Sequence, residues 1–396
     1  MNHLKKLNEK IELRKEKLDE WISAQTEEVL IPLYTSVDVR VSDFKIAPVD
    51  TNIFPAGFNN LSQVFRDRAS RLFKDYLTRK YPRVESILIV PELHTRNPSY
   101  LENILTIQSI LQKEGYRVEV GIVSDDLEQD KTSFEASGGG SVTAYKATKR
   151  GHRVSTSEGT PDLLLINNDF SEKCPTTLRD ITQPVEPPVE IGWHTRKKNI
   201  HFEFYNRLAE EASSVIGIDP GLITIDTVHL EGINFDNPSD RETAAETADS
   251  MLDKLREEYR SRGVSYEPYL FVKSNSGTYG MAVLHVADGD DIRSLNSEKR
   301  KRMRVNKGGN PVRDIVIQEG IPTSLKIDSG VTAEPVFYLV EARTAGGFLR
   351  LNKGKSELEN LNTRGMEFAH MYCPGEDVKN VDEKLLCSQA YEFISC

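Results

Sequence analysis

The first part of the chain carries apolar residues at helical spacing among charged ones. They predict an amphipathic helix over residues 3–24, with one apolar face made by Leu4, Leu7, Ile11, Leu18 and Ile22. This face would pack on the body of the protein or on a second copy in a homo-oligomer; the alternative is a solvated arm. Residues 30–60 contain three prolines and are predicted to be irregular, and residues 63–79 to be helical. We therefore assign residues 1–84 to an N-terminal helical arm and irregular segment.

From residue 85 onward, apolar runs of strand length alternate with a helical pattern. Residues 86–93, 117–124 and 162–168 predict buried strands, and residues 100–113 predict a helix between the first two. Residues 125–160 are polar and hold three consecutive glycines at 138–140, which predicts a mobile loop. The succession of strand, helix and strand predicts a doubly wound parallel sheet, an α/β fold, over residues 85–235.

Polar residues follow the first and third of these strands. Ligands of such sheets bind beyond the carboxyl ends of the strands, so these residues are candidates for substrate binding: His94, Arg96, Asn97, Asn167 and Asn168. A zinc site is not supported, because the histidines show no HExxH motif and no paired spacing with cysteine.

The last part of the chain predicts a second, sheet-rich domain over residues 236–396. A helical pattern covers residues 241–262, and strand patterns follow at 269–273, 281–286, 314–319, 335–341 and 346–351. Helix and strands together indicate an α+β domain.

The segment YLFVKSNSGTYGMAV, residues 269–283, places a lysine at the end of a strand and a loop of small residues after it. Glycines let backbone N–H groups approach an anion, and a lysine adds a point charge. The candidates for binding a polyphosphate are Lys273, Ser276, Gly277, Thr278 and Gly280. The order of residues excludes a P-loop, which needs Gly-x4-Gly-Lys-Ser/Thr. The alternative is an ordinary hairpin with a solvated lysine.

Two further segments carry candidate chemistry. Gln318 and Glu319 end a strand just before a glycine, where the backbone of a hinge could hydrogen-bond an adenine edge; an edge strand with a surface glutamate is the alternative. Arg350 suits a transferring phosphoryl group, and carboxylate and amide oxygens suit Mg²⁺, here from Glu359, Asn360 and Asn362. A polar loop with Asx turns would explain the same residues. The basic run 299–307 could neutralise phosphates or form a solvated helix face.

Composition narrows the class of protein. The chain has 396 residues, is 38% hydrophobic and carries a formal net charge of −10, which disfavours general nucleic-acid binding. No apolar run reaches the roughly 18 residues of a membrane span, and the first residues lack a signal-peptide core, so we expect a cytoplasmic protein that does not contact membranes. Its four cysteines form no CxxC pair and are expected to stay reduced.

Taken together in order, several segments resemble the proteobacterial ATP-grasp type of glutamate–cysteine ligase. They are PELHTRNPSYLENI, LLINNDFS, IGWHTRKKNIHF, YLFVKSNSGTYGMAV, KRMRVNKGG, DIVIQEGIPT and the run from AEPVFYLV through GGFLRLN to ENLNTRGMEF, within residues 85–370. The resemblance implies a doubly wound (pre-ATP-grasp) domain followed by an ATP-grasp domain. It also implies ligation of glutamate to cysteine with ATP and Mg²⁺, the first step of glutathione synthesis.

The resemblance also implies roles for individual residues. Lys273 would bind the α- and β-phosphates under the glycine loop, and Arg350 would stabilise the transferring phosphoryl group. His194 and Arg196 would join the substrate-binding residues already named. A strict Glu-x-Asn metal strand is not clear here, and Glu359 with Asn360 and Asn362 is its substitute. Two alternatives stay open: a ligase for another acid and amine, and an inactive nucleotide-binding regulator.

Overall fold

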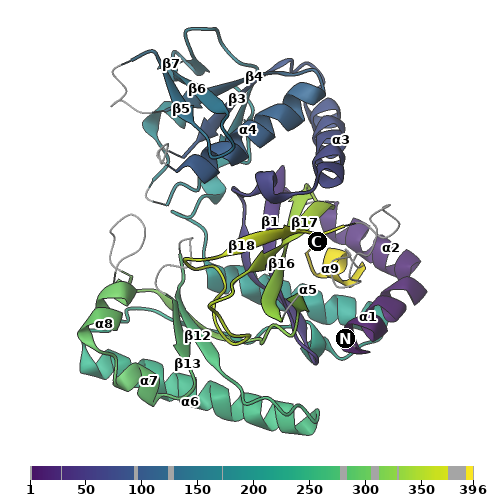
Figure 1. Cartoon of the computed structure of the whole chain (residues 1–396), viewed down its shortest axis with the longest axis vertical. Coiled ribbons are helices and arrows are strands. Elements are labelled where there is room, and N and C mark those ends of the chain that lie inside the picture. The colour runs from purple at the N-terminus through teal and green to yellow at the C-terminus, as the bar shows by residue number, and fades with distance from the viewer. Residues whose placement is uncertain are drawn as a thin grey trace.

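The computed structural model describes residues 2–27, 29–92, 97–123, 129–171, 173–276, 283–304, 312–327, 330–372 and 389–395. Within these ranges the chain has a mixed α/β fold built on three larger sheets and one small hairpin. Figure 1 shows the parallel sheet at the top, the six-stranded antiparallel sheet in the middle and the four-stranded sheet at the lower left.

The six-stranded antiparallel sheet joins the beginning and the end of the chain. Its order is β18-β17-β16-β1-β2, with β15 beside β16. The prediction that residues 30–60 are irregular is wrong, because β1 and β2 lie there. Pro48 is tolerated because β2 is an edge strand and the register shifts at this point. The strands are β1 (Tyr34–Val41), β2 (Ile46–Asn52), β15 (Lys326–Ile327), β16 (Val331–Val340), β17 (Arg343–Leu351) and β18 (Glu367–His370).

The second sheet has the order β10-β9-β3-β4-β6-β5, and every pair except β5 with β6 is parallel. The predicted parallel sheet is thus present. The prediction of a loop over 125–160 is wrong for its described part, which forms β5, β6 and the hairpin β7–β8. The strands are β3 (Ser86–Pro91), β4 (Arg117–Ile122), β5 (Lys131–Glu135), β6 (Ser141–Lys146), β7 (Thr148–Arg150), β8 (Arg153–Ser155), β9 (Leu163–Asn167) and β10 (Val185–Glu186).

Helices cover one face of the parallel sheet. Ile87 and Ile89 of β3 pack with Ile104 and Ile107 of α4 (Pro98–Lys113). On the other face, Leu88 and its neighbours pack against the segment 170–191, with its short helical turns, so a second layer of α-helices is not seen among the described residues. In this respect the predicted doubly wound arrangement is wrong: loop side chains bury the second face. The turns are η2 (Thr176–Leu178) and η3 (Val189–Ile191).

The four-stranded antiparallel sheet has the order β11-β14-β12-β13. The helix α6 (Pro238–Ser261) packs its small apolar residues, such as Ala244 and Ala248, on Leu270 and Ile317 of this sheet. The strand β11 lies before residue 235 but pairs with β14, so this sheet contains strands from both sides of the predicted domain boundary. The elements are β11 (Thr227–Leu230), β12 (Leu270–Ser274), β13 (Val283–Val286), β14 (Ile315–Glu319), α7 (Asp290–Arg293) and α8 (Ser297–Arg304).

The predicted N-terminal helix is two helices, α1 (Asn2–Leu13) and α2 (Lys15–Thr26). Leu7, Ile11 and Leu18 are buried, so the apolar face packs on the body and the arm is not solvated. α1 contacts α9 (Gln389–Ser395) and α2 contacts α5 (Lys198–Ile216), which Figure 1 shows around the six-stranded sheet.

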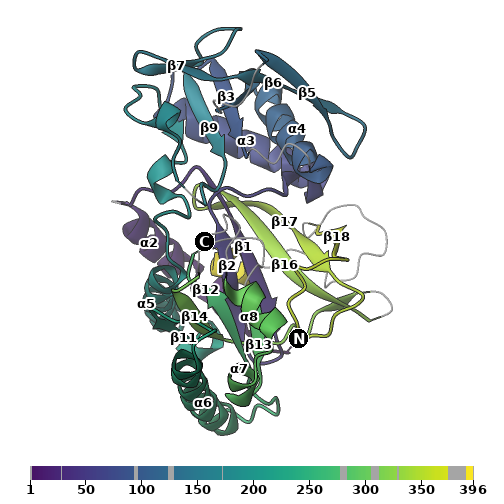
Figure 2. The same ribbon diagram turned by 90° about the vertical axis from the view of Figure 1, so that its left-hand side faces the viewer.

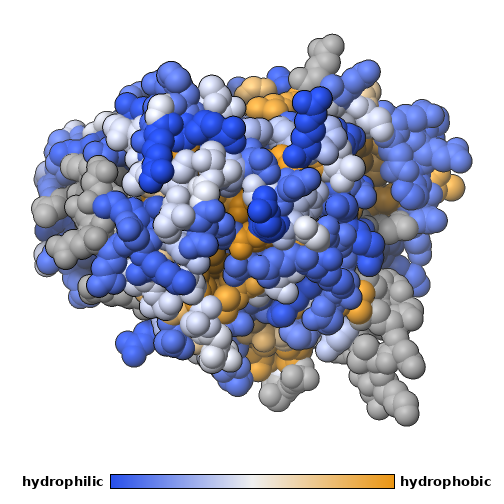
Figure 3. Space-filling model, turned by 90° about the horizontal axis from the view of Figure 1, so that it is seen from above, coloured by the Kyte–Doolittle hydropathy of each residue, from blue (hydrophilic) through white to orange (hydrophobic). Residues whose placement is uncertain are grey.

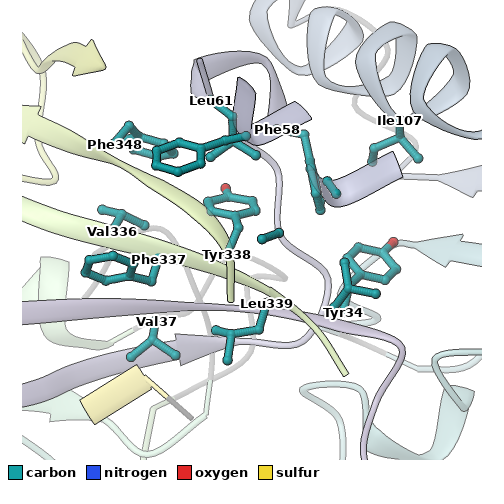
Figure 4. Close-up of a cluster of buried hydrophobic side chains, with 14 of the residues drawn as sticks. Tyr34, Val37, Phe58, Leu61, Ile107, Val336, Phe337, Tyr338, Leu339 and Phe348 are labelled. Atoms are coloured by element: carbon teal, nitrogen blue, oxygen red, sulfur yellow. The ribbon is translucent and has the colours of Figure 1, made fainter. Parts of the chain in front are cut away.

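The largest core joins the six-stranded sheet, the N-terminal helices and one face of the parallel sheet. Figure 4 shows Phe58, Tyr338 and Phe348 gathered in it. Phe58 comes from η1 (Phe58–Asn60), and α3 (Gln63–Lys80) adds Phe65 and Phe73 to the same core. The Tyr34 hydroxyl donates to the Ile166 carbonyl at 2.5 Å and so ties β1 to β9. The remaining turn is η4 (Pro220–Leu222).

The surface agrees with the charged composition. The face in Figure 3 is mainly hydrophilic, with apolar residues in small scattered areas. In the described ranges, no helix combines the length and the apolar character that crossing a membrane requires. The domain limits at residues 84 and 235 stay predictions, although β1 shares a sheet with β16 from the opposite end of the chain.

Candidate active site

A cavity is lined by residues of the four-stranded and the six-stranded sheets, which lie next to each other in Figures 1 and 2. It brings together four predicted site residues, Lys273, Arg350, Asn360 and Asn362. The lining is rich in charge: Asp38, Arg40, Val49, Asp50, Lys198, Phe271, Lys273, Ser274, Val283, Ile321, Glu334, Arg350, Asn360 and Asn362.

Lys273 projects from β12, the strand paired with both β13 and β14. Its ammonium donates to Gln318 Oε1 at 2.6 Å and to the Val49 carbonyl at 3.1 Å. Burial lowers the pKa of Lys273 to about 8, although the negative charge of Asp50 acts in the opposite direction and raises it. Among the described residues the hydrogen-bond partners of this buried ammonium are neutral, so its charge is available for an anionic ligand.

Arg350 lies at the centre of a buried network of charges. Its Nη1 donates to Asp38 at 2.8 Å and to Glu334 at 2.7 Å, and Glu334 is the register partner of Arg350 across β16 and β17. Arg40 Nε contacts the other oxygen of Glu334 at 2.7 Å. Burial alone would lower the pKa of Arg350, but the two carboxylates outweigh it and raise the pKa. The guanidinium therefore stays charged, and its Nε has no hydrogen-bond partner among the described residues.

A second ion pair lies in the same wall. Asp50 of β2 is the register partner of Asp38 of β1, so the two carboxylates are cross-strand neighbours. Each is balanced by its own cation, because Lys198 donates to Asp50 as Arg350 does to Asp38. The Lys198 ammonium lies 4.5 Å from the centre of the Trp193 ring. The cavity wall thus carries positive and negative groups that are paired with each other.

The predicted metal ligands are only partly in place. The Glu359 carboxylate accepts from Lys355 and from the Ser356 backbone, which lower its pKa to about 2. It is not among the cavity-lining residues. Asn360 and Asn362 do line the cavity, near Glu334. No cluster of three His, Cys, Asp or Glu suited to a metal occurs among the described residues. The two amide side chains offer oxygens of a kind that binds Mg²⁺, an ion that usually keeps several waters and binds substrate phosphates.

Glu319 lies in the core and does not line the cavity. Its carboxylate accepts hydrogen bonds from the Lys45 ammonium at 2.6 Å and from the Tyr259 hydroxyl at 3.0 Å. Gln318 orients Lys273. Ser276 accepts from Lys197 at 3.0 Å, next to the cavity. The predicted sites Gly277, Thr278, Gly280, His94 and Arg96 lie outside the described residues.

The three predicted substrate-binding asparagines have partners within the fold. Asn97 caps α4 by accepting from Ser99 and Tyr100. The Asn167 amide donates to the Tyr34 hydroxyl and the Pro55 carbonyl, and that of Asn168 donates to the Pro91 carbonyl. None of them lines the cavity.

Asn97→Ala separates the capping role from substrate binding. Loss of an N-cap typically costs about 0.5–2 kcal/mol of stability, so we expect a lower free energy of unfolding in urea. The KM values for the amino acids should stay unchanged. A KM raised tenfold with normal stability would instead restore the predicted binding role.

Neither His194 nor Arg196 lines the cavity. The Arg196 guanidinium lies 4.7 Å from the centre of the Trp193 ring and donates to the Thr51 carbonyl at 2.7 Å. Burial lowers the pKa of Arg196 to about 10. His194 Nδ1 is buried and has no partner among the described residues. Burial, with help from Arg196, also lowers the pKa of His201 to about 3, so this imidazole is neutral.

Sequence reasoning missed Asp38, Arg40, Asp50 and Lys198. The alternation of valines with Asp38 and Arg40 over residues 37–41 was a readable strand signal. A second signal was the pair Lys197 and Lys198 at the start of a helix, where the helix dipole disfavours cations. Neither signal reveals by itself which residues meet in space.

Comparisons with known proteins agree on one family. A family model for glutamate–cysteine ligase matches residues 8–392. A solved structure from Methylobacillus flagellatus KT, assigned as a gamma-glutamylcysteine synthetase, is 31% identical, with a TM-score of 0.89 over 98% of this chain and 93% of that chain. No curated protein matches the sequence.

Two other solved structures show only distant likeness. A D-alanyl-alanine synthetase A from Vibrio cholerae is 10% identical, with a TM-score of 0.32 over 76% of each chain. A glutathione synthetase-like effector from Globodera pallida is also 10% identical, with a TM-score of 0.41 over 92% of this chain and 78% of that chain. At these values neither carries an argument about this chain.

Proposed function

The chain belongs to the glutamate–cysteine ligase family, and from this premise we propose that the cavity between the two antiparallel sheets is its active site. The family reaction joins glutamate to cysteine at the expense of ATP, as the first step of glutathione synthesis. The observation that carries the proposal is the meeting of Lys273 and Arg350, from different sheets, in one cavity.

The finer architecture follows the same proposal. The four-stranded and six-stranded sheets would be the two lobes of an ATP-grasp domain that hold ATP between them, and the parallel sheet would belong to the preceding domain. The position of the cavity between the two antiparallel sheets supports this arrangement. The cytoplasmic location and a homo-oligomeric state remain predictions.

The nucleotide would lie along β12. Lys273 supplies a positive charge for the α- and β-phosphates, and Gln318 holds its ammonium in place. Val49, Phe271, Val283 and Ile321 offer apolar surface for the adenine ring. Gln318 and Glu319 would then act through orientation and hinge structure, because Glu319 is paired with Lys45.

In the proposed reaction the protein mainly positions the substrates and neutralises their charge. A γ-carboxylate oxygen of glutamate attacks the γ-phosphorus of ATP, the bond to ADP breaks, and a γ-glutamyl phosphate forms. The cysteine amine then attacks the acyl carbon, inorganic phosphate leaves with the C–O bonding pair, and the nitrogen loses a proton. Arg350, which donates to Asp38 and Glu334, would stabilise negative charge on the transferring group.

Asn360 and Asn362 would hold Mg²⁺ through their amide oxygens, and the ion would neutralise charge on the phosphates. We expect EDTA to abolish turnover and added Mg²⁺ to restore it. The melting temperature of the protein without nucleotide should not change on chelation, because the described residues show no metal site made by protein alone. A large fall in that temperature would point to a structural metal instead.

One assay tests the function directly. Purified protein is mixed with ATP, Mg²⁺, glutamate and cysteine, and the dipeptide γ-glutamylcysteine is detected by mass spectrometry with ADP release. Formation of dipeptide only with another acid or amine would identify a different ligase. Tight ATP binding without amino-acid-dependent ADP release would identify an inactive regulator.

The low pKa of Lys273 predicts a pH dependence of nucleotide binding. The pKa of about 8 in the free protein means that the ammonium is charged below pH 8 and neutral above it. ATP favours the charged form, so its affinity should fall as the pH rises above about 8. Calorimetry from pH 7 to 9.5 measures this. Lys273→Arg should flatten the profile because arginine stays protonated; a flat profile in the unaltered protein would contradict the prediction.

A further inference from the structure

Asp50 and Lys198 form an ion pair in the cavity wall that the nucleotide chemistry does not use. Asp50 Oδ1 accepts from the Lys198 ammonium, and the Lys198 side chain is only 8% exposed. The other Asp50 oxygen has no hydrogen-bond partner among the described residues. Both side chains line the cavity.

The other carboxylates of the cavity are already committed to arginine. Glu334 binds Arg350 through one oxygen and Arg40 through the other, and both oxygens of Asp38 accept from Arg350. Burial alone would raise the pKa of Asp50, but Lys198 and Lys273 outweigh it and lower the pKa. Asp50 is therefore an ionised acceptor with an oxygen available to a ligand.

The Lys198 ammonium has hydrogen-bond donors available to a ligand, as Asp50 has an acceptor. An ammonium has three donors, and this one makes a single hydrogen bond among the described residues, to Asp50, while it rests on the Trp193 ring. It is also the first residue of α5, where the helix dipole adds positive potential. An anion beside Lys198 is favoured by both effects.

We propose that Asp50 and Lys198 together bind an α-amino-acid head group, with the ammonium on Asp50 and the carboxylate on Lys198. A zwitterion suits an ion pair because it brings both charges and leaves the net charge of the wall unchanged. The inference rests on the proposed function and specifies its acid substrate. The ammonium of glutamate survives the reaction, whereas the amine of cysteine must be free to attack, so the head group is that of glutamate.

Two truncated substrates separate the halves of this site. Glutarate is glutamate without the ammonium, and 4-aminobutyrate is glutamate without the α-carboxylate. Rates are followed by phosphate release with ATP and cysteine, as kcat/KM for each acid. Since a hydrogen bond to a charged group contributes about 1.5–3 kcal/mol, the unaltered protein should prefer glutamate to each analogue by about 10- to 150-fold.

The variants should lose these preferences selectively. Asp50→Asn should bring the ratio of glutamate to glutarate towards one and keep the ratio to 4-aminobutyrate, and Lys198→Met should do the reverse. Asp67→Asn and Lys113→Met alter an exposed ion pair elsewhere and should leave both ratios unchanged. A uniform loss for all three acids in both variants would show that the pair is only structural and would overturn the proposal.

A binding measurement covers the remaining cases. If a variant does not fold, or if the unaltered protein forms no dipeptide, calorimetry compares the three acids on the unaltered protein with a nonhydrolysable ATP analogue. Binding of glutamate at least about tenfold tighter than both analogues supports the head-group site even where the ligase proposal has failed. Equal binding of either analogue overturns it.

Discussion

Replacing Lys273 by Ala is expected to lower kcat/KM for ATP by a factor of about 30 to 1000. The ammonium is buried, points into the cavity and has neutral hydrogen-bond partners, so its charge is available to the phosphates. Removing a charge-assisted contact in a closed site costs about 2–4 kcal/mol of transition-state stabilisation. Steady-state rates of ADP release at saturating glutamate and cysteine measure the effect.

Lys353→Ala is the matched control for this variant. Its ammonium lies at the surface, with a side chain 66% exposed, and pairs with Glu367, so its removal should change the rate less than twofold by rough estimate. Lys273→Arg keeps the charge and should retain more activity than Lys273→Ala. If Lys273→Ala were folded and turned over at the unaltered rate, the nucleotide would have to bind elsewhere.

Replacing Arg350 by Met is expected to give the largest loss of stability. Arg350 is the shared partner of two buried carboxylates, Asp38 and Glu334. Without it Asp38 loses its ion-pair partner, while Glu334 keeps only Arg40. Breaking a buried pair from one side costs about 3–5 kcal/mol, which equilibrium unfolding in urea would measure. Ligase activity should be lost as well, because no other residue is assigned to the transferring phosphoryl group.

A second arginine in the same strand provides the comparison. Arg343 lies in β17 and pairs with Asp75 at the surface, and exposed pairs contribute about 0–1 kcal/mol. Arg343→Met should therefore cost less than 1 kcal/mol by this estimate. Adding Asp38→Asn to Arg350→Met should recover part of the stability without activity. Equal losses for Arg350→Met and Arg343→Met would contradict the buried network.

Continuous apolar runs were the most reliable guide to the fold. The runs at 86–93 and 162–168 became β3 and β9, and the helices at 63–79, 100–113 and 241–262 were found within a few residues. Polar or proline-containing segments were wrongly predicted as loops or irregular structure. β5 and β6 have alternating exposure, and β2 carries Pro48 beside a shift in register. Neighbouring strands, which are not local in sequence, supply the hydrogen bonds that make these segments strands.

In the candidate site, too, local sequence pattern predicted some residues correctly and misled for others. A lysine at the end of a strand and an arginine in a strand could be named from local pattern and family resemblance, and both line the cavity. Asn167 does end a strand, β9, whereas Asn97 lies at the start of α4. Their amides nevertheless serve a helix cap and the core, because the polar groups that meet there must first satisfy one another.

What the sequence by itself determined is therefore several of the helices and buried strands, the family, and the residue types available for phosphate chemistry. Only the tertiary structure decided that β1 and β2 join strands from the far end of the chain and bring Asp38 and Asp50 to Arg350 and Lys198. Secondary structure follows from short-range periodicity, which is written in adjacent residues. The partner of a buried charge is set by packing between segments hundreds of residues apart, as the pairing of Arg350 with Asp38 across 312 residues illustrates.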